Sequence, residues 1–178
     1  MSKKIAVLRG INVGGKRKLL MADLKELMNK LGFKDILTYI QSGNIVFSSE
    51  LPPKIIETQI EKAIKEQFDY DVPVIVKEAK SIEKAVQNNP YFHESIDLKT
   101  LHLTFLKDVP SKDNIKAILE IDVKPDQFTI VEDNVYLFVE GKYHQSKLTN
   151  NFFEKKLGVG ATTRNWKTTL KLLELSKS

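Results

Sequence analysis

The order in which hydrophobic patterns follow one another constrains the fold of this chain most. Four segments of the first 78 residues have the composition of β-strands and two have the apolar spacing of helices. The strands are expected over about 3–9, 35–41, 44–47 and 72–77, and the helices over about 21–31 and 53–68. This β-α-β-β-α-β order is typical of the ferredoxin-like fold. Pro73 predicts that the last of these strands lies at a sheet edge.

The same order of elements returns in the second half, without a recognisable sequence repeat. We expect a strand over 100–107, a helix capped by Ser111, a hairpin of 128–131 with 135–139, and a helix opened by Thr149. After that helix no segment reads clearly as a last strand, and the chain ends in a helix that carries Trp166. The sequence therefore predicts an α+β fold of tandem ferredoxin-like (βαββαβ) halves, the second lacking a clear last strand.

The predicted organisation has three parts. Residues 1–78 form the first ferredoxin-like half, and residues 99–178 form the second with its C-terminal helix. Residues 79–98 connect them through a loop and a short helix. Ser81 is the expected N-cap of this helix, which must stop before Pro90.

Composition excludes several classes of protein. Of the 178 residues 42% are apolar and 29% are charged, as in a globular domain and unlike a disordered chain. Because cysteine is absent, disulfides and thiolate metal sites are excluded, and we expect a cytoplasmic location. No apolar run approaches the ~18 residues of a membrane span, so no membrane partner is expected. His93, His102 and His144 lack the spacing of metal ligands, so we expect no metal and no cofactor.

Positive charge is gathered in two segments that are far apart in the sequence. The formal net charge is +5. Residues 1–20 contain six cations and no acid, residues 142–171 contain seven cations and one acid, and the rest of the chain carries a net charge of −7. Such asymmetry indicates an anionic partner, although scattered solvated lysines remain the alternative.

A loop rich in glycine and cations follows the first strand, at residues 8–17. Glycine reaches positive φ and lets backbone N–H groups approach a ligand, and neighbouring cations favour a bound anion. Gly10, Gly15 and Lys16 match the first seven positions of a P-loop. However, Arg17 stands where a hydroxyl would hold magnesium, and the helix begins only near Met21. We therefore expect a looser anion-binding loop, with a purely structural turn as the alternative.

The right-handedness of β-α-β units places a second turn beside the glycine-rich loop. A right-handed β-α-β unit makes the first two strands parallel, so their C-terminal ends share one edge. Gln41, Ser42 and Asn44 should therefore lie beside the glycine-rich loop. Ser-Gly-Asn is also ordinary hairpin chemistry, so a structural role stays open.

The second basic segment contributes one further candidate. Thr163 is expected to cap the last helix and Trp166 to lie in the core, which puts Arg164 in the first turn, against the helix dipole. A bound anion would relieve that conflict. The predicted ligand-binding residues are Arg9, Gly10, Asn12, Gly14, Gly15, Lys16, Gln41, Ser42, Asn44, Arg164 and Asn165.

Three motifs carry a resemblance to a known family. Residues 8–16, 39–44 and 163–166, in this order, resemble a bacterial family catalogued as domain of unknown function 1697, over nearly the full length. The resemblance implies a duplicated α/β architecture and no assigned activity. Family members often carry proline before the methionine that opens the first helix. Here Leu20 precedes Met21, which we expect to affect only the rigidity of the loop.

The leading functional hypothesis is the binding of an anionic small molecule, such as a nucleotide or another phosphate ester. Whether the protein is an enzyme stays open, because no nucleophile with its base and no pair of carboxylates stands out. One alternative is a nucleic-acid-binding module that uses both basic segments as a single surface. Its first strand, however, lacks the aromatic residues of RNA-recognition domains. The other alternative is a non-catalytic protein interaction domain. The sequence leaves the oligomeric state open.

Overall fold

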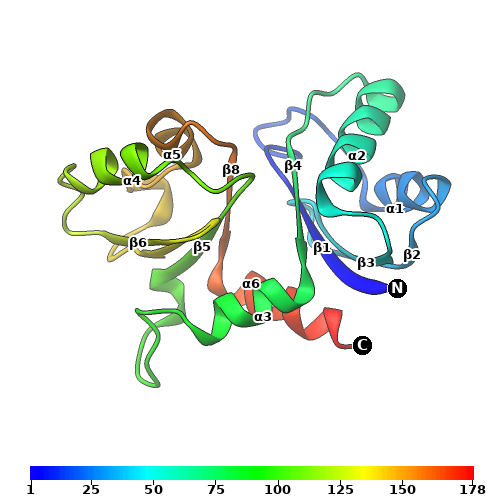
Figure 1. Cartoon of the computed structure of the whole chain (residues 1–178). Coiled ribbons are helices and arrows are strands. Elements are labelled where there is room, and N and C mark those ends of the chain that lie inside the picture. Colours follow the sequence, from blue (N-terminus) through cyan, green and yellow to red (C-terminus); the bar gives the residue numbers. More distant parts are fainter. The chain divides into compact units, whose positions relative to one another are not determined.

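The computed structural model describes residues 1–178 and contains two four-stranded sheets with helices (Figure 1). The first part of the chain forms β1 (Ser2–Leu8), α1 (Met21–Lys30), β2 (Lys34–Tyr39), β3 (Asn44–Ser49), α2 (Pro53–Phe68), β4 (Val74–Glu78) and α3 (Ala79–Gln87). The second part forms β5 (Leu101–Leu106), α4 (Lys112–Leu119), β6 (Gln127–Val131), β7 (Asn134–Phe138), α5 (Asn150–Leu157), β8 (Ala161–Asn165) and α6 (Trp166–Ser176). Two short 3₁₀ turns lie at Leu98–Thr100 and Tyr143–Gln145.

Both sheets have the strand order that the ferredoxin-like fold requires. The first has the order β2-β3-β1-β4 and the second β6-β7-β5-β8, and every neighbouring pair is antiparallel. The predicted α+β fold of tandem ferredoxin-like halves is therefore confirmed. The edge position of β4, which follows Pro73, is confirmed too.

The second half does have a last strand, which corrects one sequence expectation. Strand β8 pairs with β5 from Leu106 opposite Ala161 to His102 opposite Asn165. Thr163 therefore lies in this strand, where its Oγ1 lies 2.7 Å from Thr104 Oγ1, and it does not cap the last helix. The cap is Asn165, whose Oδ1 accepts a hydrogen bond of 2.8 Å from Thr168 N. One alanine and four polar residues give no clear pattern by themselves, and the pairing with β5 decides their conformation.

Each half also continues into an additional helix, so the structural repeat is longer than the sequence suggested. Glu78 ends β4 and Ala79 begins α3, just as Asn165 ends β8 and Trp166 begins α6. Helix α3, predicted as part of a connection, is thus the counterpart of the C-terminal helix. Because it begins at Ala79, Ser81 lies within it and is not its N-cap.

Contacts divide the chain into two compact units, Met1–Lys84 with Lys171–Ser178, and Ala85–Leu170. In the first unit α1 and α2 cover one face of the sheet (Figure 1). Its core contains Leu24, Leu27, Met28, Ile56, Ile60 and Ile64 of the helices and Ala6, Leu8, Ile45, Phe47, Val74 and Val76 of the sheet. In the second unit a core of the same kind includes Ile118 of α4 and Phe153 and Leu157 of α5. The boundaries expected at residues 78 and 98 stay a prediction.

Carboxylate groups of the helices accept hydrogen bonds from backbone N–H groups of the edge strands. Glu61 and Glu57 lie one turn apart on α2 and accept hydrogen bonds from Val74 N (2.9 Å) and Val76 N (3.0 Å) of β4. In the second unit Glu154 of α5 accepts one from Ala161 N at the start of β8 (3.1 Å). Unpaired N–H groups at a sheet edge invite pairing with another chain, so these contacts protect both edges.

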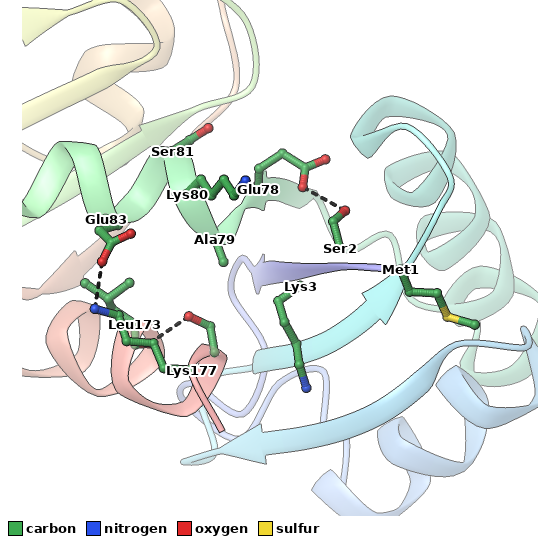
Figure 2. Close-up of a pocket in the computed structure, with 11 residues that line it drawn as sticks. Met1, Ser2, Lys3, Glu78, Ala79, Lys80, Ser81, Glu83, Leu173 and Lys177 are labelled. Carbon is green, nitrogen blue, oxygen red and sulfur yellow. Dashed lines mark hydrogen bonds and ion pairs between the residues drawn. The ribbon is translucent and has the colours of Figure 1, made fainter.

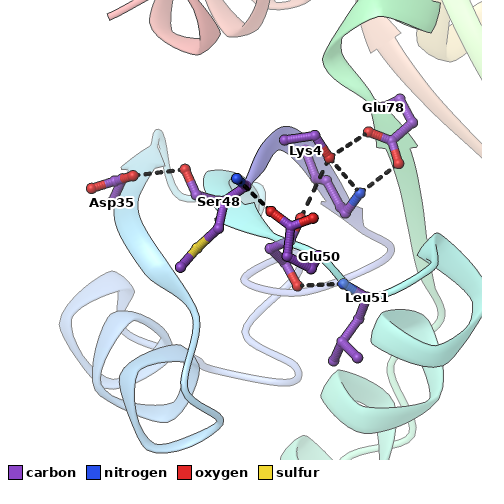
Figure 3. Close-up of polar contacts among 9 residues, drawn as sticks. Lys4, Asp35, Ser48, Glu50, Leu51 and Glu78 are labelled. Carbon is purple, nitrogen blue, oxygen red and sulfur yellow. Dashed lines mark hydrogen bonds and ion pairs between the residues drawn. The ribbon is translucent and has the colours of Figure 1, made fainter.

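An ion pair between a buried lysine and a partly exposed glutamate lies where β1 begins (Figure 3). The Lys4 side chain is 3% exposed, and its Nζ donates to Glu78 Oε1 at 2.5 Å and to Ser2 Oγ at 2.9 Å. Lys4 and Glu78 are direct neighbours in the β1–β4 register. None of the helices combines the length and the apolar character that crossing a membrane requires.

Candidate functional site

The loop between β1 and α1 is organised by the side chain of Asn12. Its Nδ2 donates to the carbonyl oxygens of Leu19 and Gln41, both at 2.8 Å, and its Oδ1 accepts from Leu19 N at 2.9 Å. Asn12 has φ = 55°, a conformation that asparagine tolerates better than most residues. These bonds close the loop and join it to the β2–β3 turn. The two glycine-containing turns therefore lie at one end of the sheet, as the topology predicted.

Gly14 and Gly15 form the tip of the loop. Lys16 N donates to Val13 O at 3.1 Å, and the two glycines between them have φ values of 59° and 73°. Two consecutive positive φ values are the signature of a type I′ turn, which glycine forms without strain. A Cβ at either position would meet no atom within 4 Å, so both glycines face open space.

Three consecutive cations follow the turn. Lys16, Arg17 and Lys18 are all exposed, and none of the ion pairs in the structure involves them. The Arg17 guanidinium lies over Gly10, because a Cβ at Gly10 would stand 3.1 Å from Arg17 Nη1. Arg17 and Lys18 are missing from the residues predicted from the sequence. The signal was present, because both directly follow Lys16 in a segment without acids.

The β2–β3 turn is held by its own side chains. Asn44 is fully buried, and its Nδ2 donates to Tyr39 O at 3.0 Å and to Ser42 Oγ at 2.9 Å. Gly43 has φ = 81°, and its carbonyl lies against β1, where Leu8 N donates to Gly43 O at 2.8 Å. Gln41 offers its backbone carbonyl to Asn12 and has an exposed side chain.

The predicted residues of the first unit thus fall into two groups. Asn12 and Asn44 donate to backbone carbonyls and Ser42 accepts from Asn44, whereas the remaining predicted residues other than Arg9 are exposed, namely Gly10, Gly14, Gly15, Lys16 and Gln41. Arg9 is half-buried, and its backbone N–H donates to Pro73 O at 3.0 Å.

Exposed apolar side chains belong to the same loop and to the β2–β3 turn that it contacts. Val13 is 65%, Leu20 64% and Ile40 48% exposed. All three lie within one residue of Asn12 or of a carbonyl that it binds. Ile40 also has φ = 50°, which is rare for a β-branched residue. Backbone strain of this kind gathers at binding surfaces.

Arg164 lies in β8 and not, as predicted, in the first turn of a helix. It is half-buried, and its Nη1 donates to Thr163 O at 3.1 Å. Burial lowers the pKa of Arg164 to about 10, an effect that Tyr143 opposes, so the guanidinium stays charged at neutral pH. Asn165 is exposed but uses its side-chain oxygen as the helix cap.

The three histidines differ in burial and in their contacts. His102 is buried and stacks on Tyr143 with ring centroids 4.7 Å apart, and burial lowers its pKa. His93 Nδ1 lies 3.0 Å from Ser95 Oγ, and His144 is exposed. No group of three or more acidic or histidine side chains is arranged to hold a metal ion.

Comparisons with known proteins support the fold. A family model described as "Protein of unknown function (DUF1697)" matches residues 1–136. Among solved structures, the conserved bacterial protein SP0830 from Streptococcus pneumoniae is similar, with a TM-score of 0.80 and 23% identity over 98% of each chain. That likeness concerns the fold. No curated protein matches the chain.

Proposed function

The chain belongs to the DUF1697 family, whose description assigns no function, and we therefore propose from its own geometry that it binds a phosphate-bearing small molecule. The proposed site is the basic loop, by which we mean residues 9–20. A nucleotide or another phosphate ester is the class of ligand. A cytoplasmic location, expected from the absence of cysteine, is part of the proposal.

One observation carries the proposal: three exposed cations without carboxylate partners follow a glycine turn whose backbone is fixed. Arginine and lysine form short, charge-assisted hydrogen bonds to phosphate oxygens. Because Asn12 already orders the loop, binding costs little further conformational entropy. The backbone at Gly14 and Gly15 is open, so a phosphate can approach it closely.

The apolar flank favours a ligand with a body beside its phosphate. Val13 and Leu20 offer apolar surface within the basic loop, and Ile40 offers it in the turn that Asn12 joins to this loop. Inorganic phosphate makes no use of such surface, whereas a base or an acyl chain does. In this proposal Gln41 supplies a hydrogen bond, and Arg9, Arg164 and Asn165 stay predicted contributors.

Calorimetric titration of the full chain with adenosine monophosphate tests the proposal. We expect the double substitution Lys16→Glu with Arg17→Glu to weaken binding at least about tenfold, since it reverses two ligand-facing charges. Lys25→Glu is the matched control, because Lys25 is an exposed cation of α1 without an ion pair. It should bind like the wild type.

Two results would contradict the proposal. One is the lack of binding to any nucleotide or sugar phosphate at millimolar concentration. The other is equal weakening by Lys25→Glu and by the loop substitutions. If the protein instead binds a single-stranded oligonucleotide with steep salt dependence, while mononucleotides do not bind, the nucleic-acid-binding alternative is correct.

A further inference from the structure

The first unit contains a cavity of about 740 Å³ at the other end of β1 from the basic loop (Figure 2). Its walls are the start of β1, the junction of β4 with α3, and the last turns of α6. None of the residues predicted to bind a ligand lines it. The volume lies within the range that small-molecule sites occupy in proteins.

The carboxylates in the wall of the cavity are already neutralised. Glu78 accepts hydrogen bonds from Lys4 Nζ and, at 3.1 Å, from Ser2 Oγ. Glu83 pairs with Lys177 at 2.7 Å (Figure 2). The acidic groups therefore do not repel an incoming anion as free carboxylates would.

Two cations of the wall have no comparable partner. Lys80 is exposed, and none of the ion pairs in the structure involves it. Lys3 has only Asp35, whose Oδ2 lies 3.8 Å from its Nζ, beyond hydrogen-bond distance. No acidic residue stands in the first turn of α3 to offset Lys80. The wall of the cavity therefore carries positive charge that no carboxylate of the protein balances.

The rest of the wall is apolar or carries hydroxyl groups. Met1, Ala79 and Leu173 contribute apolar surface, and Ser81 lies beside Lys80. Such a wall suits the uncharged body of a ligand whose charged group meets Lys80.

We propose that this cavity is a second ligand site, for a small organic molecule that carries a carboxylate or phosphate group. Lys80 pairs with the oxyanion, and Ala79 and Leu173 contact the body of the molecule. The site does not depend on the basic loop, so either proposal can fail without the other.

Amide chemical shifts of the isotope-labelled full chain test this inference, with succinate and phenyl phosphate as probes and erythritol as the neutral control. We expect saturable shifts at residues 2–3, 79–83 and 173–177 with at least one of the anions and none with erythritol. Lys80→Gln should weaken the response at least about fivefold, since it removes one charge–charge contact. Lys25→Gln, a matched exposed lysine of the same unit, should leave it unchanged.

The two anions separate carboxylate from phosphate recognition. The double substitution Lys16→Glu with Arg17→Glu should leave these shifts in place, which distinguishes the cavity from the basic loop. The inference is overturned if neither anion shifts these residues at about 20 mM, a concentration that reveals even weak sites. It is also overturned if Lys80→Gln responds like the wild type, or if erythritol produces the same shifts.

Discussion

At the scale of single residues, polar side chains with long-range partners organise this protein. Asn12 closes the basic loop on itself and joins it to the β2–β3 turn with three hydrogen bonds. Lys4 and Glu78 do the same for the two strands at the opposite end of the first sheet. Each of these groups is costly to leave without its partner in a buried place.

The Lys4–Glu78 pair should respond unequally to the loss of either partner. Glu78→Ala leaves the buried ammonium of Lys4 without its carboxylate. We expect a loss of about 2 kcal/mol in the free energy of unfolding, below the usual value for a fully buried pair because Glu78 is 37% exposed. Lys4→Met leaves a carboxylate that water can reach, so its effect should stay within about 1 kcal/mol.

Urea unfolding of both variants measures the difference. The opposite order, with Lys4→Met the more damaging, would show that the pair is not governed by the desolvation of Lys4.

At the scale of elements, the turns restrict which residue can occupy a position more strictly than the helices do. The φ of Gly43 is 81°, and a Cβ there would lie 2.7 Å from Leu8 Cβ and 2.8 Å from Ile11 Cδ1. Gly14 also has positive φ but faces open space. The same residue type thus has a packing role in one turn and only a conformational role in the other.

Alanine at these two glycines should therefore differ in cost. We expect Gly14→Ala to lose about 1 kcal/mol of unfolding free energy, the usual cost of a left-handed residue with a Cβ. Gly43→Ala adds the displacement of Leu8 and Ile11, and should lose at least about 3 kcal/mol. Thermal or urea unfolding of the two variants checks the prediction, and similar losses would contradict the packing role of Gly43.

At the scale of the whole molecule, the two halves repeat one architecture with different chemistry at matched positions. Lys4 stands opposite Glu78 at the end of β4, and His102 stands opposite Asn165 at the end of β8. An ion pair thus occupies one sheet where a neutral, buried imidazole occupies the other. The second sheet should therefore be the one that responds to mild acid.

The pH dependence of stability follows from His102. Burial lowers its pKa, against the smaller opposing effects of the Thr100 carbonyl and Asp126. The unfolded chain then binds more protons than the folded one, so stability is fully present above about pH 6.5 and falls as the pH drops toward the folded-state pKa. The slope reaches at most about 1.4 kcal/mol per pH unit.

Urea unfolding at several pH values between 7.5 and 5 measures this loss. His102→Gln cannot titrate and should remove the part of the pH dependence that begins near pH 6.5. An identical pH profile for wild type and variant would exclude His102 as its source.

Much of the candidate site was visible in the sequence, because its signals are local. The sequence predicted an exposed, positively charged turn from Gly14, Gly15 and Lys16. The structure has such a turn. Arg17 and Lys18 carried the same signal and were omitted. The internal roles of Asn12 and Asn44 were not foreseeable, since their partners lie in other segments of the chain.

The sequence by itself determined the order of helices and strands apart from β8, the caps at Ser111 and Thr149, and the meeting of the two glycine turns. Periodicity and capping are properties of neighbouring residues, and the handedness of β-α-β units is general. Only the tertiary structure decided that residues 161–165 form a strand, that Asn165 caps the last helix, and that His102 is buried. It alone shows the cavity beside Lys80. These features depend on partners distant in the chain, and only folding brings such partners together.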